Sequence, residues 1–426
     1  MDGWSGPQEM TIFSQAPHEP LNPYNHVNQS KFRQIDAQPF AAGSFALVYR
    51  GILTNGEEVA IKILRPSIKK NLHKDLSILR KLCWCFSRFL PQLLVNYNNA
   101  YTECEHAFLS ETDYIQEIAN QQYFYKLYTN NPNIIIPKVY SDLSSNDAIV
   151  QELIKGPTLA DIMSSNSTQS PSELTRQLTG SDLWTQIKIV GGEALFMAMC
   201  TDYVYGDPHP GNIILLTNNR IGIIDFGVIA NKPSSHRAFH DWVKSYYGIL
   251  VNASDFSQLL ETTVTCFAPD LSIAMKRCNF TSGNFLKVLT DSMTEKLTRE
   301  VIDNQSYIET FRNGHLIDVF LKVINAKIIS INIETINIKL IKAIQAFLGS
   351  ITILDNSESH HKFSKIMLET MQYALEKSYQ YGIPNDTITS TSLTLTDSYE
   401  LIINTISNLA DNDEIMFNLV NERLFA

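Results

Sequence analysis

Residues 205–216 read YGDPHPGNIILL, and residues 221–227 follow as IGIIDFG. Asp207 therefore stands five residues before Asn212, and Asp225 stands thirteen residues after Asn212. The polar residues between the two quoted stretches have apolar runs on both sides, which predicts a short hairpin turning at Asn218 and Asn219. Such a hairpin would return Asp225 toward Asn212. Carboxylate and amide oxygens are the hard ligands that a phosphate-bound cation prefers, so the stretch indicates phosphate chemistry.

The same spacing occurs in the catalytic loops of phosphoryl-transferring kinases. In that interpretation Asp207 orients the phosphoryl acceptor and takes its proton, Asp225 is the main Mg²⁺ ligand, and Asn212 is the second ligand. The alternative is that Asp207 only caps a helix and Asp225 only ends a strand. The D-x4-N pattern is common by itself, but it becomes specific when a hairpin and Asp-Phe-Gly follow it.

A lysine far upstream fits this interpretation. The strand-like runs FALVYRGIL (45–53) and EEVAIKIL (57–64) flank Asn55-Gly56, which predicts a hairpin with a type I′ turn and positive φ at both residues. Lys62, near the end of the second run, matches the kinase lysine that contacts the α- and β-phosphates. It needs a carboxylate partner on a facing helix, and 111–125 (ETDYIQEIANQQYFY) offers three. We expect Glu117, which shares a helix face with Asn120, to be that partner.

The loop before the lysine strand, FAAGSFALVY (40–49), is rich in alanine where a protein kinase has a glycine-rich loop. Extra Cβ atoms stiffen the turn and occupy space near the phosphates, so the nucleotide is expected to sit differently. The residues expected to line the nucleotide site are Ala41, Ala42, Gly43, Ser44, Val48, Ala60, Lys62, Glu152 and Leu153.

Together these segments resemble the UbiB family, the AarF-like atypical kinases. Residues 39–66 resemble the family's alanine-rich loop and lysine strand, and 111–121 resemble its ExD helix, with Glu111 and Asp113 as the regulatory pair. GDPHPGN and DFG resemble its catalytic and metal loops, and 339–356 resemble a late helix. The resemblance implies a protein-kinase-like fold, ATP and Mg²⁺ as cofactors, and a role in ubiquinone or other isoprenoid-lipid metabolism as an ATPase or small-molecule kinase.

The chain also departs from this family. A KxGQ motif usually precedes the alanine-rich loop, and its lysine pairs with the first glutamate of ExD. Here about 38 residues precede the loop, and KFRQ (31–34) lacks the glycine, so we interpret it as the first strand. Glu111 is then expected to lack that partner, and basal nucleotide turnover to be comparatively high. Tyr205 stands where the family often has histidine.

Two rival functions come from other classes. An aminoglycoside- or choline-kinase-like enzyme has similar catalytic loops, and a deep acidic pocket in the helical part would favour it. A pseudokinase scaffold would bind nucleotide without turnover. After DFG the chain has no Ala-Pro-Glu and no long activation segment, which argues against a protein substrate.

The expected fold is α+β and two-lobed, with a small strand-rich N-lobe and a large helical C-lobe. The domain boundaries are a loosely ordered tail at 1–36, the N-lobe at 37–153, the C-lobe at 154–356 and a helical extension at 357–426. The extension could contact a membrane or a partner, although packing on the C-lobe is favoured.

Composition excludes some functions. The formal net charge of −10 argues against nucleic-acid binding, which needs clustered basic residues. The six cysteines form no CxxC pair and are expected to be reduced core residues, with Trp84 packed beside two of them. No signal peptide and no apolar run of roughly 18 residues is present, so a cytoplasmic location is expected, with peripheral membrane contact possible and a small-molecule or lipid substrate as partner. His209 is expected to be a hydrogen-bonding loop residue.

Overall fold

The computed structural model describes residues 22–43, 45–89, 101–102, 105, 108–165, 169–233, 235–251, 256–267, 269–279, 281, 347, 349–351, 354, 362–383, 396 and 400. The chain divides into two compact units. The first comprises Met1–Gly156 and Gly222–Val228, and the second comprises Pro157–Ile221 and Ile229–Ala426.

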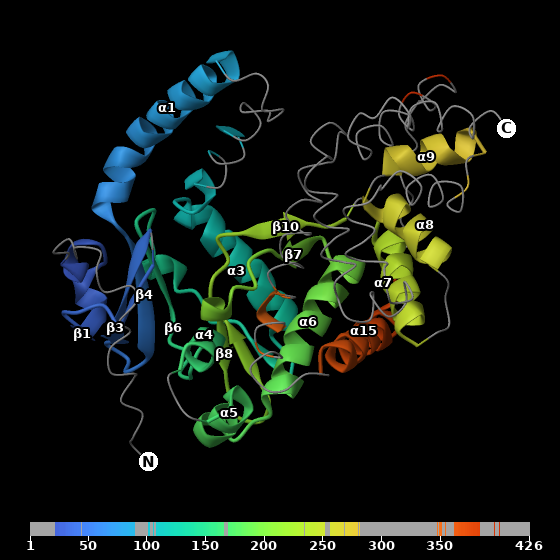
Figure 1. The fold of residues 1–426 in the computed structure, drawn as a ribbon. Helices are drawn as coiled ribbons and strands as arrows, with labels where there is room; N and C mark the ends of the chain where they lie inside the picture. Colours follow the sequence, from blue (N-terminus) through green and yellow to red (C-terminus); the bar gives the residue numbers. More distant parts are fainter. Residues whose placement is uncertain are drawn as a thin grey trace. The chain divides into compact units, whose positions relative to one another are not determined.

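An antiparallel sheet forms the centre of the first unit (Figure 1). Its strands lie in the order β1 (Phe32–Ile35), β3 (Ala46–Leu53), β4 (Glu58–Leu64) and β6 (Ala148–Glu152), and β2 (Ala41–Ala42) pairs with β3. Successive side chains on a strand point to opposite faces. One face therefore presents the apolar core and the other presents Lys62.

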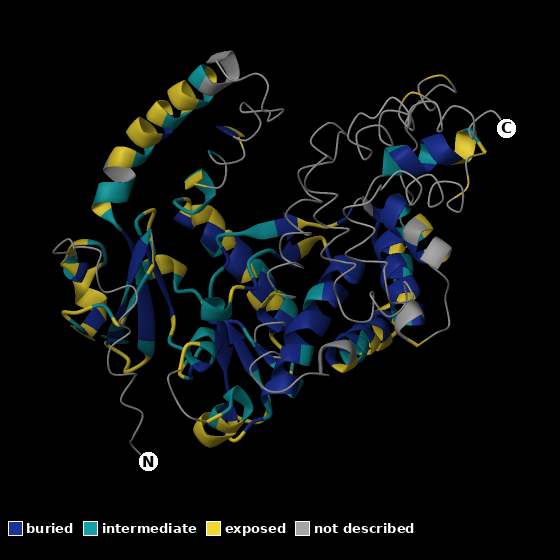
Figure 2. Cartoon of the chain, viewed as in Figure 1, coloured by how far each residue is buried: buried dark blue, intermediate teal, exposed yellow. Residues whose placement is uncertain are grey.

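The core face is almost fully buried, as the dark strands of Figure 2 show. Leu47 and Tyr49 of β3 pack there with Val59, Ile61 and Ile63 of β4, and each is at most 1% exposed. Burying a side chain of this size contributes roughly 1.5–3 kcal/mol. Shifting the register by one residue would move this whole set to the other face, so the core fixes which face carries the lysine.

The turn between β3 and β4 corrects one prediction. The hairpin at Asn55-Gly56 is present, but only Gly56 has a positive φ, of 90°. The Asn55 side chain instead accepts a hydrogen bond from the backbone N–H of Glu57 at 3.0 Å. This Asx-type turn satisfies the backbone locally, so the type I′ geometry is not used.

Part of the expected tail is also ordered. Residues Pro23–Asn25 and Gln29–Lys31 form 3-10 turns, and β1 follows directly. The Tyr24 hydroxyl accepts from the Ile35 backbone N–H at 3.0 Å and ties these turns to the sheet. This stretch is therefore not the loosely ordered tail that the sequence predicts, and the prediction that KFRQ is the first strand holds for residues 32–34, whereas Lys31 ends a 3-10 turn.

Two long helices complete the first unit. They are α1 (Pro66–Phe89), which follows β4, and α3 (Tyr114–Tyr128). The short elements β5 (Ile134–Ile135) and Ser141–Leu143 precede β6. The side chain of Trp84 on α1 is 62% exposed, so the expectation that it packs in the core is wrong.

The second unit is mainly helical. Its helices are α4 (Leu159–Met163), α5 (Pro171–Thr179), α6 (Leu183–Cys200), α7 (His236–Leu250), α8 (Phe256–Phe267), α9 (Pro269–Arg277) and α15 (Lys362–Tyr381). The short strands are β7 (Tyr203–Tyr205), β8 (Ile213–Leu215), β9 (Ile221–Ile223), which crosses into the first unit, and β10 (Ile229–Asn231). Helix α6 is buried along most of its length, with α7 and α15 packed against it (Figure 2).

A glycine pair lets α15 approach α6 closely. A Cβ on Gly191 would lie 2.9 Å from Thr370 Cγ2, and one on Gly192 would lie 2.3 Å from Tyr373 Cδ1, both on α15. Next to them, Glu193 is 1% exposed, and both of its carboxylate oxygens accept from Lys377 Nζ, at 2.5 and 2.6 Å. The contact between α6 and α15 therefore combines close packing with an ion pair whose carboxylate is buried.

The hairpin between β8 and β9 turns where the sequence predicts. Asn218 and Asn219 have φ of 59° and 56°. The start of α6 holds this turn, because Asp182 N–H donates to Asn219 Oδ1 at 2.8 Å and Gln186 Nε2 donates to Arg220 O at 2.7 Å. These bonds fix the length of the connection between the two predicted metal-ligand segments.

No helix within the described ranges combines the length and the apolar character that crossing a membrane requires. The five described cysteines are free thiols, as expected. Cys200 and Cys266 are buried, but Cys83, Cys85 and Cys278 are only half-buried, so the expectation of core cysteines holds for two. Cys104 lies outside the described residues.

Candidate active site

In the first unit one lysine lies between two carboxylates. Lys62 Nζ lies 2.7 and 3.0 Å from the two carboxylate oxygens of Glu117 and 3.0 Å from Asp225 Oδ2. The side chains of Lys62 and Glu117 are 16% and 3% exposed, whereas that of Asp225 is 30% exposed. The pairing expected of Lys62 and Glu117 is present, and Asp225 joins the same cluster.

Helix α3 positions Glu117. Asp113 is its N-cap residue, and its Oδ1 accepts from the Gln116 N–H at 3.0 Å. A cap of this kind stabilises a helix by about 1 kcal/mol. Within the expected ExD pair, Asp113 thus begins the helix that carries the glutamate. Glu111 lies half-buried just before the helix, and its charge is one cause of the raised pKa of Glu117.

Three contacts hold the DFG loop in the first unit. Asn120 Nδ2 donates to Phe226 O at 2.9 Å, and Gln151 Nε2 donates to Ile224 O at 3.4 Å. The Phe226 ring stacks on Phe124 with centroids 5.2 Å apart. Sequence reasoning placed Asn120 on the face of Glu117 but missed its bond to the loop. In the sequence, Gln151 is distinguished only as a polar residue within an apolar strand, which does not predict its bond to the loop.

The cluster shifts the acidity of its members. Burial raises the pKa of Glu117 to about 7, although the Lys62 ammonium opposes the shift. Burial also raises the pKa of Asp225, but Lys62 and the Gly227 N–H outweigh it, and the net pKa is lowered. Burial lowers the pKa of Lys62, while the two carboxylates raise it well above its usual value. Lys62 therefore stays charged, and the proton that titrates near neutral pH belongs to Glu117.

Tyr114 is a further polar residue beside the cluster. It is 1% exposed, and its ring centroid lies 5.6 Å from Lys62 Nζ. Its hydroxyl is buried and makes no hydrogen bond. A buried hydroxyl without a hydrogen-bond partner lowers the stability of the folded state. Nothing in the sequence pattern marks Tyr114 as a residue of this cluster.

The alanine-rich loop is held in a defined shape. Ala41 and Ala42 form β2, and the Gly43 N–H donates to Ala46 O at 2.9 Å. The Arg65 guanidinium donates to Gly43 O through Nε at 3.3 Å and through Nη2 at 3.1 Å. Arg65 is thus a loop-positioning residue that sequence reasoning missed.

The other residues expected at the nucleotide site divide into two groups. Ser44 lies outside the described residues. Val48 pairs directly with Lys62, and Ala60 lies two residues before Lys62 on β4, so both occupy the lysine face of the sheet. This placement agrees with the expectation for Val48 and Ala60, whose contacts with nucleotide stay a prediction.

Glu152 and Leu153 are placed differently. The Glu152 N–H donates to Lys138 O at 2.8 Å, and the Leu153 N–H donates to Glu58 O at 3.2 Å. The Glu152 side chain is exposed and accepts from the Lys138 N–H at 3.3 Å. Both backbone donors are therefore already used, and only carbonyl oxygens remain to bind a base edge.

The GDPHPGN loop belongs to the second unit. Asn212 Nδ2 donates to Asp207 Oδ2 at 2.9 Å, which leaves the Asn212 amide oxygen as its ligand atom. His209 Nδ1 accepts from the Gly211 N–H at 3.1 Å, so its expected place as a hydrogen-bonding loop residue is confirmed. The loop is preorganised by its own side chains.

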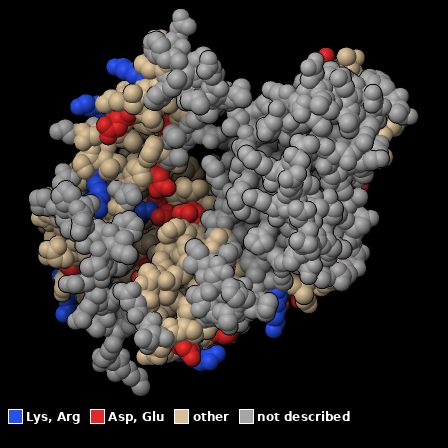
Figure 3. Space-filling view, in the orientation of Figure 1, with Lys and Arg blue, Asp and Glu red and all other residues tan. Residues whose placement is uncertain are grey.

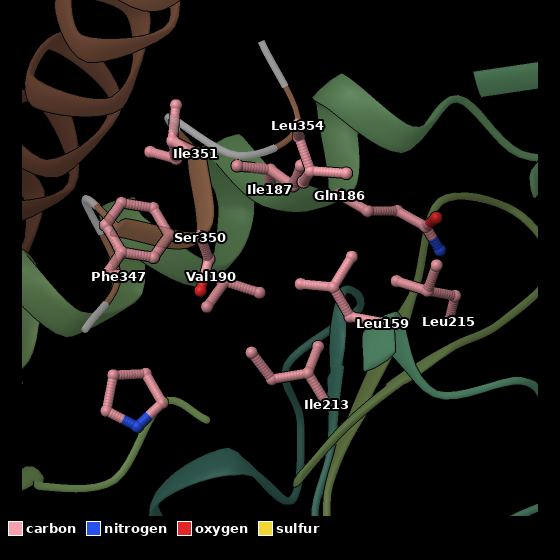
Figure 4. Close-up of a pocket in the computed structure, with 11 residues that line it drawn as sticks. Leu159, Gln186, Ile187, Val190, Ile213, Leu215, Phe347, Ser350, Ile351 and Leu354 are labelled. Atoms are coloured by element: carbon pink, nitrogen blue, oxygen red, sulfur yellow. The ribbon is translucent and has the colours of Figure 1, made fainter. Parts of the chain in front are cut away.

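A small apolar pocket lies beside this loop within the second unit (Figure 4). Side chains from α4, α6 and β8 line it together with residues near 350. The lining residues are Leu159, Gln186, Ile187, Val190, Pro208, Ile213, Leu215, Phe347, Ser350, Ile351 and Leu354. None of them is acidic, so this pocket does not favour the cationic substrates of an aminoglycoside- or choline-kinase-like enzyme.

The donor set fits Mg²⁺ only together with a phosphate ligand. In the part of the chain that the structure describes, no three His, Cys, Asp or Glu side chains form a group that could hold a metal ion. Mg²⁺ typically binds one or two carboxylates, several waters and substrate phosphates. Within the first unit, Asp225 supplies a carboxylate of this kind, and phosphate and water would provide the other ligands.

Comparison with known proteins gives one family. Residues 22–251, more than half of the chain, match the model of the ABC1 atypical kinase-like domain. The Arabidopsis thaliana chloroplast protein named ACTIVITY OF BC1 COMPLEX KINASE 1 is 32% identical over 235 residues, which cover 54% of this chain and 33% of that protein. A probable serine/threonine-protein kinase of Dictyostelium discoideum, abkC, is 24% identical over 188 residues, 44% of this chain and 25% of its own length. The chain thus spans about a third or less of the length of these relatives.

A solved structure supports the fold. Rv3197 of Mycobacterium tuberculosis, determined in complex with erythromycin, aligns with a TM-score of 0.51 at 19% identity, covering 79% of this chain and 77% of that one. At this identity the likeness shows the fold alone. The predicted α+β, kinase-like fold, with an antiparallel N-terminal sheet and a helical portion, is confirmed.

Proposed function

Because the chain belongs to the ABC1 atypical kinase-like family, we propose that it binds ATP with Mg²⁺ and hydrolyses it or transfers its γ-phosphoryl group. The proposed acceptor is a small molecule or a lipid of isoprenoid-quinone metabolism rather than a protein. The observation that supports this most directly is the position of Lys62 Nζ, within 3.0 Å of both Glu117 and Asp225.

Each residue of that cluster has a proposed task. Glu117 holds Lys62 in place, and the ammonium then contacts phosphate oxygens. Asp225 is the Mg²⁺ ligand, and it is the most exposed of the three side chains. When bound, Mg²⁺ neutralises the charge of the phosphates and polarises the transferred group.

The second unit supplies the proposed base. Asp207 accepts the proton of the attacking hydroxyl or water, and Asn212 fixes the carboxylate through its 2.9 Å hydrogen bond. A positioned general base contributes roughly 10²–10⁴-fold to a rate. Because Asn212 donates through its amide nitrogen, its amide oxygen is the atom proposed as the second ligand of the cation.

The segment after DFG supports a substrate other than protein. Helix α7 begins at His236, which leaves eight residues after Gly227. Three of these form β10, which pairs with β7. A peptide-binding activation segment needs more chain than this, so a small molecule or a lipid head group is the better fit.

The test compares two aspartates that lie close in sequence. Asp207→Asn should leave the Kd for Mg-ATP within about threefold and lower phosphate release at least about 100-fold. The matched control is Asp202→Asn, because the Asp202 side chain is 69% exposed and pairs with Lys232 at 3.2 Å on the surface. Binding is measured by calorimetry and turnover by phosphate release, with and without quinone precursors and lipid head groups.

The outcomes separate the alternatives. Equal loss in both variants would remove Asp207 from the base role. If the wild-type protein binds Mg-ATP but releases and transfers no phosphate with any acceptor, the chain is a nucleotide-binding scaffold. Turnover that rises only with a cationic amine or aminoglycoside would favour the small-molecule kinase alternative.

A further inference from the structure

Helix α1 differs in charge from the rest of the chain. Residues 66–89 contain six lysines and arginines and one aspartate, although the whole chain has a formal net charge of −10. We propose that the exposed face of α1 binds the surface of an anionic lipid bilayer. This inference goes beyond the proposed function and does not depend on nucleotide binding.

One stripe of α1 faces the protein. Leu76 is 5% exposed, and Leu72, Leu79 and Cys83 are half-buried. These residues recur at intervals of three and four, which places them on a single side of the helix. The stripe therefore accounts for the packing of α1 without using its other apolar residues.

A second apolar group lies on the exposed side. Ile78 and Leu82, one turn apart, are each 48% exposed, and Trp84 is 62% exposed. Lys74 and Lys81, both exposed, precede and follow Ile78 by four and three residues, so they flank it on the helix surface. Figure 3 shows basic side chains along the part of the surface where α1 lies. We call Lys74, Ile78, Lys81 and Leu82 the α1 face, and Trp84 projects about a third of a turn away from Ile78, beside this face.

This combination selects the partner. Lysines beside exposed aliphatic residues suit an anionic membrane, where the ammonium groups reach the head groups and the apolar side chains enter the acyl boundary. A nucleic acid would use the lysines but would leave Ile78 and Leu82 in water. A neutral membrane would leave the lysines without a partner. The negative charge of the remaining chain repels an anionic surface, so the protein should approach such a surface with the α1 face toward it.

The experiment uses the full chain and flotation with vesicles of two compositions. One is phosphatidylcholine alone, and the other also contains phosphatidylglycerol. The wild-type protein should float only with the anionic vesicles, and less as salt increases. Lys74→Glu combined with Lys81→Glu should weaken binding by about tenfold or more, since each lysine near an anionic surface contributes measurably.

The control carries the same change in charge elsewhere. Lys155→Glu combined with Lys365→Glu alters two exposed lysines outside α1 and should leave flotation within about twofold of wild type. Ile78→Asn combined with Leu82→Asn should weaken binding while keeping the charge. Circular dichroism and the thermal midpoint identify a variant that fails to fold. If a variant fails to fold, the test uses tryptophan fluorescence of the wild-type protein instead of flotation. Anionic vesicles should shift the emission to the blue, and Trp84→Phe should remove part of that shift.

Three results would overturn the proposal. The first is equal binding to neutral and anionic vesicles, and the second is an equal loss in the two lysine pairs. The third is unchanged vesicle binding in the Ile78 and Leu82 variant together with strong binding to single-stranded DNA, which would assign the face to polyanions. None of these outcomes bears on Mg-ATP turnover, so the two proposals fail separately.

Discussion

Two half-buried lysines, one in each unit, pair with buried glutamates but have different surroundings. Lys377 contacts both carboxylate oxygens of Glu193, and the Tyr373 hydroxyl donates to the same carboxylate at 2.5 Å. One positive and one negative charge balance there. Lys62 instead meets two carboxylates, so that cluster carries an excess negative charge once Glu117 is ionised, above its raised pKa of about 7.

The difference teaches what each cluster can do. A balanced and hydrogen-bonded pair is complete, and it joins α15 to α6. An unbalanced cluster has capacity for a further cation, and Tyr114 beside it has an unused hydroxyl. The comparison therefore predicts that changes at Lys377 act on stability, whereas changes at Lys62 act on ligand binding.

The largest effect is expected for Lys377→Met. This change leaves the Glu193 carboxylate buried without its cation, which costs about 3–5 kcal/mol of unfolding free energy. Urea unfolding followed by circular dichroism measures the loss. Lys365→Met on the same helix is the control, because Lys365 is 73% exposed and should shift the value by less than about 0.5 kcal/mol.

Lys62→Met sharpens the contrast. It should abolish measurable Mg-ATP binding while costing less stability than Lys377→Met, because a proton on Glu117 can replace the lost charge. Equal stability losses with intact nucleotide binding would show that both clusters are structural, and would contradict the different roles assigned to them.

The next effect depends on pH. The pKa of Glu117 is raised from 4.5 to about 7, so between these values the folded state binds a proton that the unfolded state has lost. Stability should therefore fall as pH rises through this window, by up to about 3 kcal/mol, and Glu117→Gln should flatten the slope. The lowered pKa of Asp225 acts in the opposite direction, and its window lies below pH 3.8.

The measurement is the urea midpoint at several pH values. Glu376→Gln, an exposed change on α15, should keep the wild-type profile. A Glu117→Gln profile parallel to wild type across pH 4.5–7 would mean that Glu117 is ionised throughout, and that the cluster holds its negative charge even in mild acid.

A smaller loss is expected at the glycine pair. Gly192→Ala places a methyl 2.3 Å from the Tyr373 ring and should cost about 1–3 kcal/mol, because the ring must move and disturb its bond to Glu193. Gly349→Ala meets no atom within 4 Å and should be neutral or slightly stabilising. Thermal unfolding compares the two, and equal midpoints would show that α15 adjusts freely.

The smallest effect has the opposite sign. Tyr114→Phe removes a buried hydroxyl that lacks a partner and should stabilise the nucleotide-free protein by about 1 kcal/mol. Tyr373→Phe, the same change at the balanced cluster, should destabilise because it breaks a bond to a carboxylate. A destabilised Tyr114→Phe variant would reveal a bond made by its hydroxyl in solution.

The sequence was most informative where chemistry and spacing agree. The Lys62–Glu117 pair could be predicted because a strand lysine needs an opposite charge, and only a few carboxylates lie on a suitable helix. The turn at Asn218 and Asn219 could be predicted because asparagine tolerates a positive φ. Both predictions rest on local rules combined with one known constellation.

Other features depended on tertiary packing. Glu193 and Lys377 are 184 residues apart, and neither has a neighbour that marks it as paired. The Arg65 contact to Gly43 ends on a backbone oxygen, which any residue could supply. Trp84 was assigned to the core because it stands between two cysteines, whereas its position on the helix leaves it exposed. At Asn55 a side-chain bond replaced the expected backbone geometry.

The path of the chain through β9 has a practical consequence. Residues Gly222–Val228 belong to the first unit, but the chain on both sides of them belongs to the second. A fragment ending at Gly156 would lack Asp225 and the carbonyl groups that Asn120 and Gln151 bind. A cut at one peptide bond therefore cannot separate a complete first unit from the second, and an isolated piece that ends at Gly156 would need the seven residues supplied as a graft or a separate peptide.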